Sequence, residues 1–141
     1  MIQNFGGMVV EGSADPKVKI ADSIAHCLRN ATVQHLIVCG HTRCRSLAAL
    51  LGKDAQERLK PFRQIRESIS RRFELYEKRS EHEWLKIIAQ ETVLLQLAAL
   101  NSDTSIRFRL SNGSLQLHGW MRDDQTSAIT AFDPTTSQFS T

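Results

Sequence analysis

The chain has 141 residues, of which 41% are hydrophobic and 23% charged, and this composition excludes disordered, fibrous and membrane-spanning proteins. The net charge of +3 at pH 7 does not indicate a nucleic-acid surface, because the basic residues between Lys53 and Arg79 are interleaved with acidic ones. Three cysteines and an N-terminus without a secretory leader pattern favour a reducing, cytoplasmic location.

The first half of the chain predicts alternating strands and helices. Residues 1–10 have the pattern of a short strand with a glycine turn, and residues 15–30 that of a helix with an aspartate N-cap. The apolar run His35–Cys39 ends at Gly40, as expected for a parallel strand whose sheet is covered by helices on both faces. Residues 43–51 are prone to form a further helix.

Two longer helices are predicted next. Apolar side chains recur every three or four positions over residues 59–76, which indicates an amphipathic helix. Ser80 and Glu83 form a capping box, and the apolar periodicity after them predicts a helix that ends near Leu100.

The C-terminal region predicts a β-hairpin and a tail. Apolar and polar residues alternate over residues 106–110, residues 111–113 favour a tight turn, and the alternation resumes over residues 115–120. Residues 134–141 are polar and predict a frayed tail, so we expect a single domain over residues 1–133.

His41 and Cys44 are the candidate metal ligands. The segment Cys39–Cys44 places an imidazole and a thiol three residues apart, where a predicted strand gives way to a helix and α/β folds build sites. A thiol in the first helical turn feels the positive end of the helix dipole, which favours the thiolate that binds zinc. The spacing alone leaves a second interpretation open, a turn histidine beside a packed cysteine, because two ligands do not make a zinc site.

The other cysteines and histidines are expected to be structural. Cys27 lies too far along the chain from His41 to join it, so we expect it in the core. Cys39 can point to the same side of its strand as His41, but burial is the favoured prediction. The histidines assigned no catalytic role are His26 and His82 on helix surfaces, His35 at a strand entry, and His118.

Several motifs in order resemble the β-class carbonic anhydrases. Residues 36–44 resemble the family's apolar strand followed by Cys-Gly-His-x-x-Cys. The closing segment Gly113–Trp120 is similar to the family's Gly-x-Leu-x-Leu-His-Gly-Trp. Weaker likenesses are residues 2–9 to its Arg-Asn-Ala-Gly strand, 22–25 to the following helix, and 91–100 to its Glu-Asn-Val helix.

The resemblance implies an α/β fold, with a mostly parallel sheet flanked by helices, and reversible hydration of CO2 to bicarbonate. Family members use zinc held by two cysteines and one histidine, and by this resemblance His41 and Cys44 match two of these ligands. The other ligand and an Asp/Arg pair belong to a Cys-x-Asp-x-Arg strand that has no counterpart in the sequence, so we expect the first central strand to be missing and assign no catalytic residue. Gln3 replaces the family's usual arginine. Arg45 replaces a small residue, and its charge is expected to repel zinc while its bulk is expected to crowd the substrate pocket.

Two main hypotheses for function follow. One is a carbonic anhydrase with impaired activity, and the other a catalytically inactive structural or regulatory relative that pairs with itself or with an active enzyme. A third is a redox or metal-sensing module using Cys39 and Cys44. A missing central strand leaves backbone groups unpaired, so a homo-oligomer, most simply a dimer, is expected, without nucleic acid or membrane partners.

Overall fold

The computed structural model describes residues 22–29, 32–48 and 80–141. Several predictions lie outside these residues: the strand over residues 1–10 with Gln3, the start of the helix predicted from residue 15, and the helix over residues 59–76.

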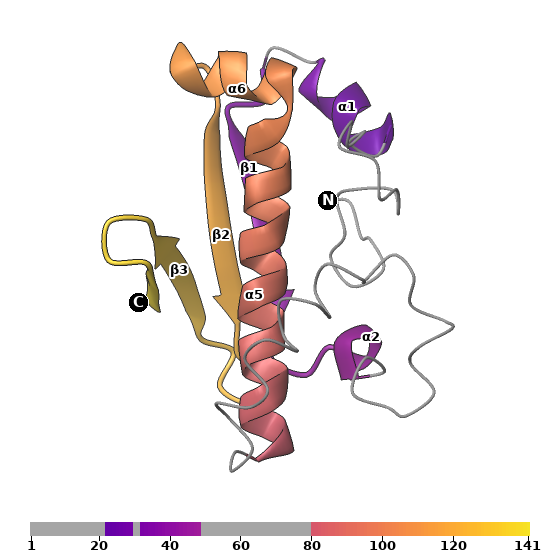
Figure 1. The fold of residues 1–141 in the computed structure, drawn as a ribbon, viewed down its shortest axis with the longest axis vertical. Coiled ribbons are helices and arrows are strands. Elements are labelled where there is room, and N and C mark those ends of the chain that lie inside the picture. The colour runs from indigo at the N-terminus through magenta and orange to yellow at the C-terminus, as the bar shows by residue number, and fades with distance from the viewer. Residues whose placement is uncertain (1–21, 30–31, 49–79) are drawn as a thin grey trace.

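The described residues contain a four-stranded sheet with the strand order β1-β2-β3-β4 (Figure 1). The first two strands, β1 (His35–His41) and β2 (Gln116–Arg122), are parallel. The other two, β3 (Ile129–Asp133) and β4 (Gln138–Ser140), continue the sheet in antiparallel pairings. The predicted α/β class is confirmed, but this part of the sheet is mixed rather than mostly parallel.

A long helix, α5 (Glu81–Ser102), packs along β1 and β2 (Figure 1). It begins at the predicted capping box, in which the Glu83 N–H donates to Ser80 Oγ (3.4 Å) and the Ser80 N–H donates to Glu83 Oε2 (2.9 Å). Both bonds satisfy N–H groups that have no partner within the helix. The core forms where α5 meets the sheet, and its largest fully buried side chains are Ile88, Val93, Leu100, Ile106 and Leu115.

Two short helices flank β1 in the sequence. The first, α1 (Asp22–Leu28), lies within the helix predicted over residues 15–30 and buries Ile24. The second, α2 (Arg45–Ala48), lies within the helix predicted over residues 43–51 and buries Leu47. Across residues 22–29, 32–48 and 80–141, no helix has both the length and the apolar character needed to cross a bilayer.

The predicted hairpin is wrong in its first strand, because residues 104–111 form the helix α6 (Thr104–Ser111). Asp103 is its N-cap, and Asp103 Oδ1 accepts hydrogen bonds from the Ser105 N–H (2.9 Å) and the Ile106 N–H (3.1 Å). The alternation that suggested a strand does not describe one buried face, since Ile106 is 1% exposed and Phe108 68%. The chain then turns at residues 112–115 and enters β2, which extends past Trp120 to Arg122.

The predicted frayed tail is also wrong in part, because residues 138–140 form β4. Ser140 lies opposite Ala131, and the rings of Phe132 and Phe139 lie 5.3 Å apart between centroids. Asp133 Oδ1 stabilises the connecting turn by accepting from the Thr135 N–H (2.8 Å). A polar composition thus concealed a strand that has one partly buried aromatic side chain. The single domain over residues 1–133 stays a prediction.

Candidate metal-binding site

The two predicted ligands lie at the end of β1. His41 is the last residue of the strand and is exposed, whereas Cys44 directly precedes α2 and is only 8% exposed. The Cys44 carbonyl accepts from the Ala48 N–H (2.9 Å), so the cysteine is held at the first turn of the helix.

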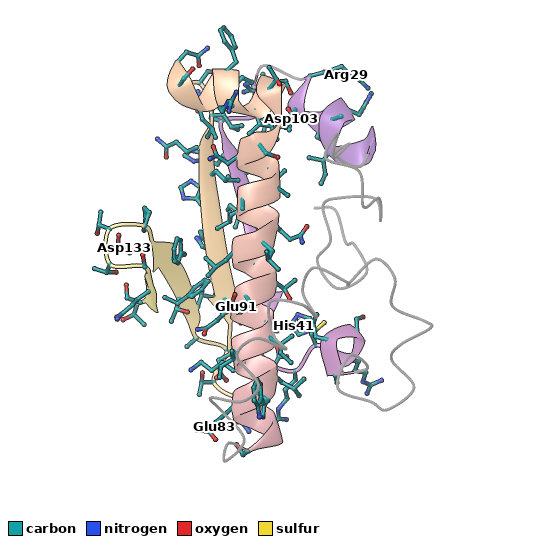
Figure 2. The ribbon with its side chains drawn as sticks, viewed as in Figure 1. Arg29, His41, Glu83, Glu91, Asp103 and Asp133 are labelled. Carbon is teal, nitrogen blue, oxygen red and sulfur yellow. The ribbon has the colours of Figure 1, made fainter. Side chains whose placement is uncertain are left out.

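His41 and Cys44 line the same open hollow between β1, α2 and α5. Figure 2 shows His41 beside α2 and the lower half of α5. The other residues that line it are mostly small or apolar: Val38, Cys39, Gly40, Leu47, Ala89, Thr92, Val93 and Gln96. The structure therefore brings together the imidazole and the thiol that the sequence singled out.

Thr92 and Gln96 are buried polar residues of this hollow that the sequence reasoning did not assign to the site. They are 4% exposed each and lie one helical turn apart on α5. Thr92 Oγ1 donates to the Ile88 carbonyl (2.7 Å), so its hydroxyl hydrogen is directed into the helix. Polar residues at buried positions of an apolar helix face are the signal that would have identified them.

The loop between the two predicted ligands is tied to the turn after β2. The Thr42 N–H donates to the Arg122 carbonyl (3.1 Å), and the Asp124 N–H donates to Thr42 Oγ1 (3.1 Å). The Arg43 N–H donates to Asp124 Oδ2 (3.3 Å). Asp124 Oδ1 in turn accepts from the Arg122 guanidinium (3.0 Å). We call these four contacts the Asp124 clamp.

The turn that carries Asp124 is itself held by hydrogen bonds. The Thr126 and Gln125 N–H groups donate to Asp123 Oδ1 (3.0 and 2.8 Å), and these bonds lower the pKa of the Asp123 carboxyl below its usual value. The Asp123 N–H donates to the Ala128 carbonyl (2.8 Å). The side of the clamp that lies after β2 is therefore well fixed.

The structure places neither of the other two cysteines at the buried position that the sequence predicted for it. Cys27 is exposed on α1 and not in the core, because Ile24 takes the buried side of this helix. Cys39 lines the hollow but is exposed, so the prediction of burial is wrong for the residue as a whole. Partial burial of its thiol nevertheless raises the pKa of Cys39, and the Arg122 guanidinium offsets part of this rise.

Arg45 does not crowd the hollow in the way the sequence suggested. It is exposed at the start of α2 and is absent from the residues that line the hollow.

The histidines at the other end of the parallel strands contact each other. His35 Nδ1 and His118 Nε2 lie 3.1 Å apart, across the β1–β2 pairing. One ring nitrogen donates and the other accepts, which links the two strands at the sheet surface. His26 and His82 are exposed, as predicted for helix surfaces.

His41 and Cys44 are ligands of the kind that zinc prefers, but the described residues do not provide a complete set of zinc ligands. An imidazole and a thiolate are ligands that zinc prefers, and His41 and Cys44 supply one of each to the same hollow. Within residues 22–29, 32–48 and 80–141, however, no group of three His, Cys, Asp or Glu side chains is placed to hold a metal ion.

The family model for carbonic anhydrase matches residues 1–129 of this chain. The chain belongs to the β-class carbonic anhydrase family. Among characterised relatives, carbonic anhydrase 1 of Escherichia coli O157:H7 is 27% identical over 143 residues, with 98% of this chain and 64% of the relative covered. The carbonic anhydrase of Pseudomonas aeruginosa is 25% identical, with 99% of this chain and 64% of the relative covered. This chain thus spans a little under two thirds of the length of these relatives.

Solved structures agree with this family assignment. The β-carbonic anhydrase CcaA superposes with a TM-score of 0.78 at 25% identity, covering 98% of this chain and 69% of that one. A tetrameric β-carbonic anhydrase from Sordaria macrospora shares the fold with a TM-score of 0.67 at 22% identity, covering 78% of this chain and 57% of that one. The resemblance seen in the sequence and the predicted fold are both confirmed.

Proposed function

We propose that this chain takes part in the reversible hydration of CO2 to bicarbonate, with His41 and Cys44 as two ligands of a zinc ion. The observation that carries the proposal is that these two side chains line one hollow at the end of β1, in a chain that belongs to the β-class carbonic anhydrases. All cysteines and histidines of the chain lie within the described ranges, so the remaining zinc ligand is proposed to come from another chain or from a carboxylate outside these ranges.

The residues around the hollow have distinct roles in this proposal. Cys44 and His41 would hold the metal, which would supply Lewis-acid chemistry at this site. Val38, Leu47 and Val93 provide an apolar wall suited to a small, non-polar gas molecule. The low exposure of Cys44 limits the access of bulk water and oxidants to its sulfur.

Zinc content per chain, measured by elemental analysis together with stopped-flow CO2 hydration, tests this proposal. We expect zinc binding in the wild type with turnover impaired by the lack of the family's Asp/Arg pair, and a loss of both in Cys44→Ser and in His41→Gln. Cys27→Ser and His82→Gln are the matched controls, because they change the same residue types at exposed positions that do not line the hollow. A folded wild type without zinc and turnover would contradict the proposal and favour the inactive structural or regulatory relative.

We also propose that the chain forms a homo-oligomer. This is supported by the structural likeness to an enzyme described as tetrameric. Light scattering after size-exclusion chromatography would measure the mass, and a mass equal to that of one chain at micromolar concentration would contradict it.

A cytoplasmic location is proposed as well, because Cys27, Cys39 and Cys44 are all free thiols and a reducing compartment keeps them so. Cell fractionation with an antibody to the chain tests this, and recovery in a secreted fraction would overturn it.

A further inference from the structure

We infer that Asp124 is a positioning residue that holds the His41–Cys44 loop in its metal-binding arrangement. The inference builds on the proposed function for the role of the two ligands, but the clamp itself stands on contacts within this chain. Asp124 lies far from the loop in sequence, and its contacts with Thr42 and Arg43 join residues 82 and 81 positions apart.

The Asp124 clamp contacts the segment that joins the two predicted ligands. Its two targets, Thr42 and Arg43, are the only residues between His41 and Cys44. The Thr42 side chain is fixed because it is 2% exposed and its Oγ1 accepts from the Asp124 N–H. The Arg43 backbone is fixed because its N–H donates to the Asp124 carboxylate. The separation and orientation of the two ligands therefore depend on residue 124.

The Asp124 clamp also contains an ion pair, between Arg122 and Asp124. Arg122 lies directly opposite His41 in the parallel pairing of β1 and β2, so its cation is carried next to the strand end that presents the imidazole. Asp124 Oδ1 accepts from the Arg122 guanidinium at 3.0 Å, and its side chain is only 21% exposed. The carboxylate thus keeps a positive charge paired where an unpaired one would oppose the binding of a divalent cation.

These two effects predict different behaviour for two substitutions. Asp124→Asn keeps an oxygen that can accept from the Arg43 N–H but leaves the Arg122 charge unpaired. Asp124→Ala removes both the acceptor and the charge. If Asp124 positions the loop, Cys44 should remain largely protected from alkylation in Asp124→Asn. Metal affinity, in contrast, should fall in both Asp124→Asn and Asp124→Ala.

The test is the rate at which iodoacetamide alkylates Cys44 in the zinc-free full-length chain, followed residue by residue by mass spectrometry. Cys27 in the same molecule is the internal reference, since it is exposed and on α1. We expect Asp124→Ala to raise the Cys44 rate about tenfold through local opening of the loop, and Asp124→Asn to raise it about threefold or less. Asp133→Asn is the matched control, because Asp133 caps a similar turn between β3 and β4, and it should leave the Cys44 rate unchanged.

A second variant keeps the test decisive if Asp124→Ala fails to fold. Thr42→Val retains the shape of the buried side chain but removes the acceptor for the Asp124 N–H, and we expect it to raise the Cys44 rate in the same direction. Equal Cys44 rates in wild type, Thr42→Val and folded Asp124→Ala would overturn the inference.

Cobalt titration provides the metal readout, because a thiolate bound to Co2+ gives a charge-transfer absorption band. We expect weaker Co2+ binding in Asp124→Asn and recovery in Arg122→Gln/Asp124→Asn, where the unpaired cation is removed. An unchanged Co2+ affinity in Asp124→Asn would overturn the role assigned to its charge. If the wild type binds neither Co2+ nor Zn2+, the proposed function fails, while the alkylation rates still decide whether Asp124 holds the loop.

Discussion

The two faces of β1 and β2 differ in what covers them. On the face towards α5, Val38 is 7% exposed and Met121 3%, whereas Ile37, the neighbour of Val38 on the opposite face, is 41% exposed. The sequence predicted helices on both faces of β1, but among the described elements α5 makes the main helix contacts with this strand. An apolar run in a strand therefore does not show how many of its faces are buried. Substitutions on the two faces should differ in their effect on stability.

The largest effect is expected deep in the α5 face. Ile88→Ala removes most of a side chain that is 0% exposed, so the lost contacts and the resulting cavity should lower the free energy of unfolding by about 2–5 kcal/mol. Urea denaturation followed by circular dichroism measures this change. A loss below about 1 kcal/mol would mean that the core under α5 is loosely packed.

The next effect tests how closely α5 approaches the strands. A Cβ added to Gly40 would lie 2.8 Å from Met121 Sδ and 2.8 Å from Val93 Cγ2, and that Val93 contact leaves little room for adjustment. We expect Gly40→Val to cost about 1–3 kcal/mol of stability through overpacking. Ala131→Val is the control, because it enlarges an exposed strand position of β3, and a similar cost at both positions would contradict the close approach.

A matched pair of substitutions compares the two faces directly. Val38→Thr replaces a buried methyl group by a hydroxyl group for which no hydrogen-bond partner is provided. We expect the free energy of unfolding to fall by about 1–3 kcal/mol. Ile37→Thr retains a β-branched side chain on the more exposed face, and we expect a change of at most about 0.5 kcal/mol. Equal losses in thermal or urea unfolding would show that the Ile37 face is covered as completely as the Val38 face.

The last substitution tests whether α6 strengthens the same core, and its expected effect is smaller than that of Ile88→Ala. Asp103→Ala removes the N-cap of the helix that carries the buried Ile106, which should cost about 0.5–2 kcal/mol at neutral pH. Burial by itself raises the pKa of Asp103, but hydrogen bonds from the Ser105 hydroxyl and the Ile106 and Ser105 N–H groups outweigh it and lower the pKa below 3.8.

The pH dependence follows from this direction. A carboxyl whose pKa is lower in the folded state contributes its stabilisation above the unfolded value, 3.8, and loses it as the pH falls through the lowered value. The difference between wild type and Asp103→Ala should therefore be full at neutral pH and shrink in acid. Urea unfolding at a series of pH values checks it, and a difference that grows on acidification would contradict the assigned hydrogen bonds.

Local signals in the sequence were sufficient for part of the fold and of the site. The capping box at Ser80 and Glu83 acts over three residues, so its sequence predicts its geometry, and α5 begins there. His41 and Cys44 are likewise three residues apart on one strand-to-helix connection. Their meeting in one hollow follows from that local path.

One local signal was ambiguous. The alternation of Ile106 and Phe108 predicted a strand, but a period of two in a short window can also arise in a helix, and Asp103 is the N-cap of that helix.

Contacts between distant segments could not be predicted. Asp124 belongs to the clamp because β2 lies parallel to β1, and this pairing cannot be derived from either segment alone. The exposure of Cys27 depends in the same way on which side of α1 meets the rest of the chain.

The parallel pairing of β1 with β2 has a consequence for how the chain acquires its structure during synthesis. Thr42 and Asp124 are 82 residues apart, so at about 5–20 residues per second the ribosome needs about 4–16 s after the first to deliver the second. During that interval β1 and the His41–Cys44 loop exist without the strand that aligns them. Thr42 and Arg43 therefore receive their contacts with Asp124 only late in synthesis, after α5 has already been made.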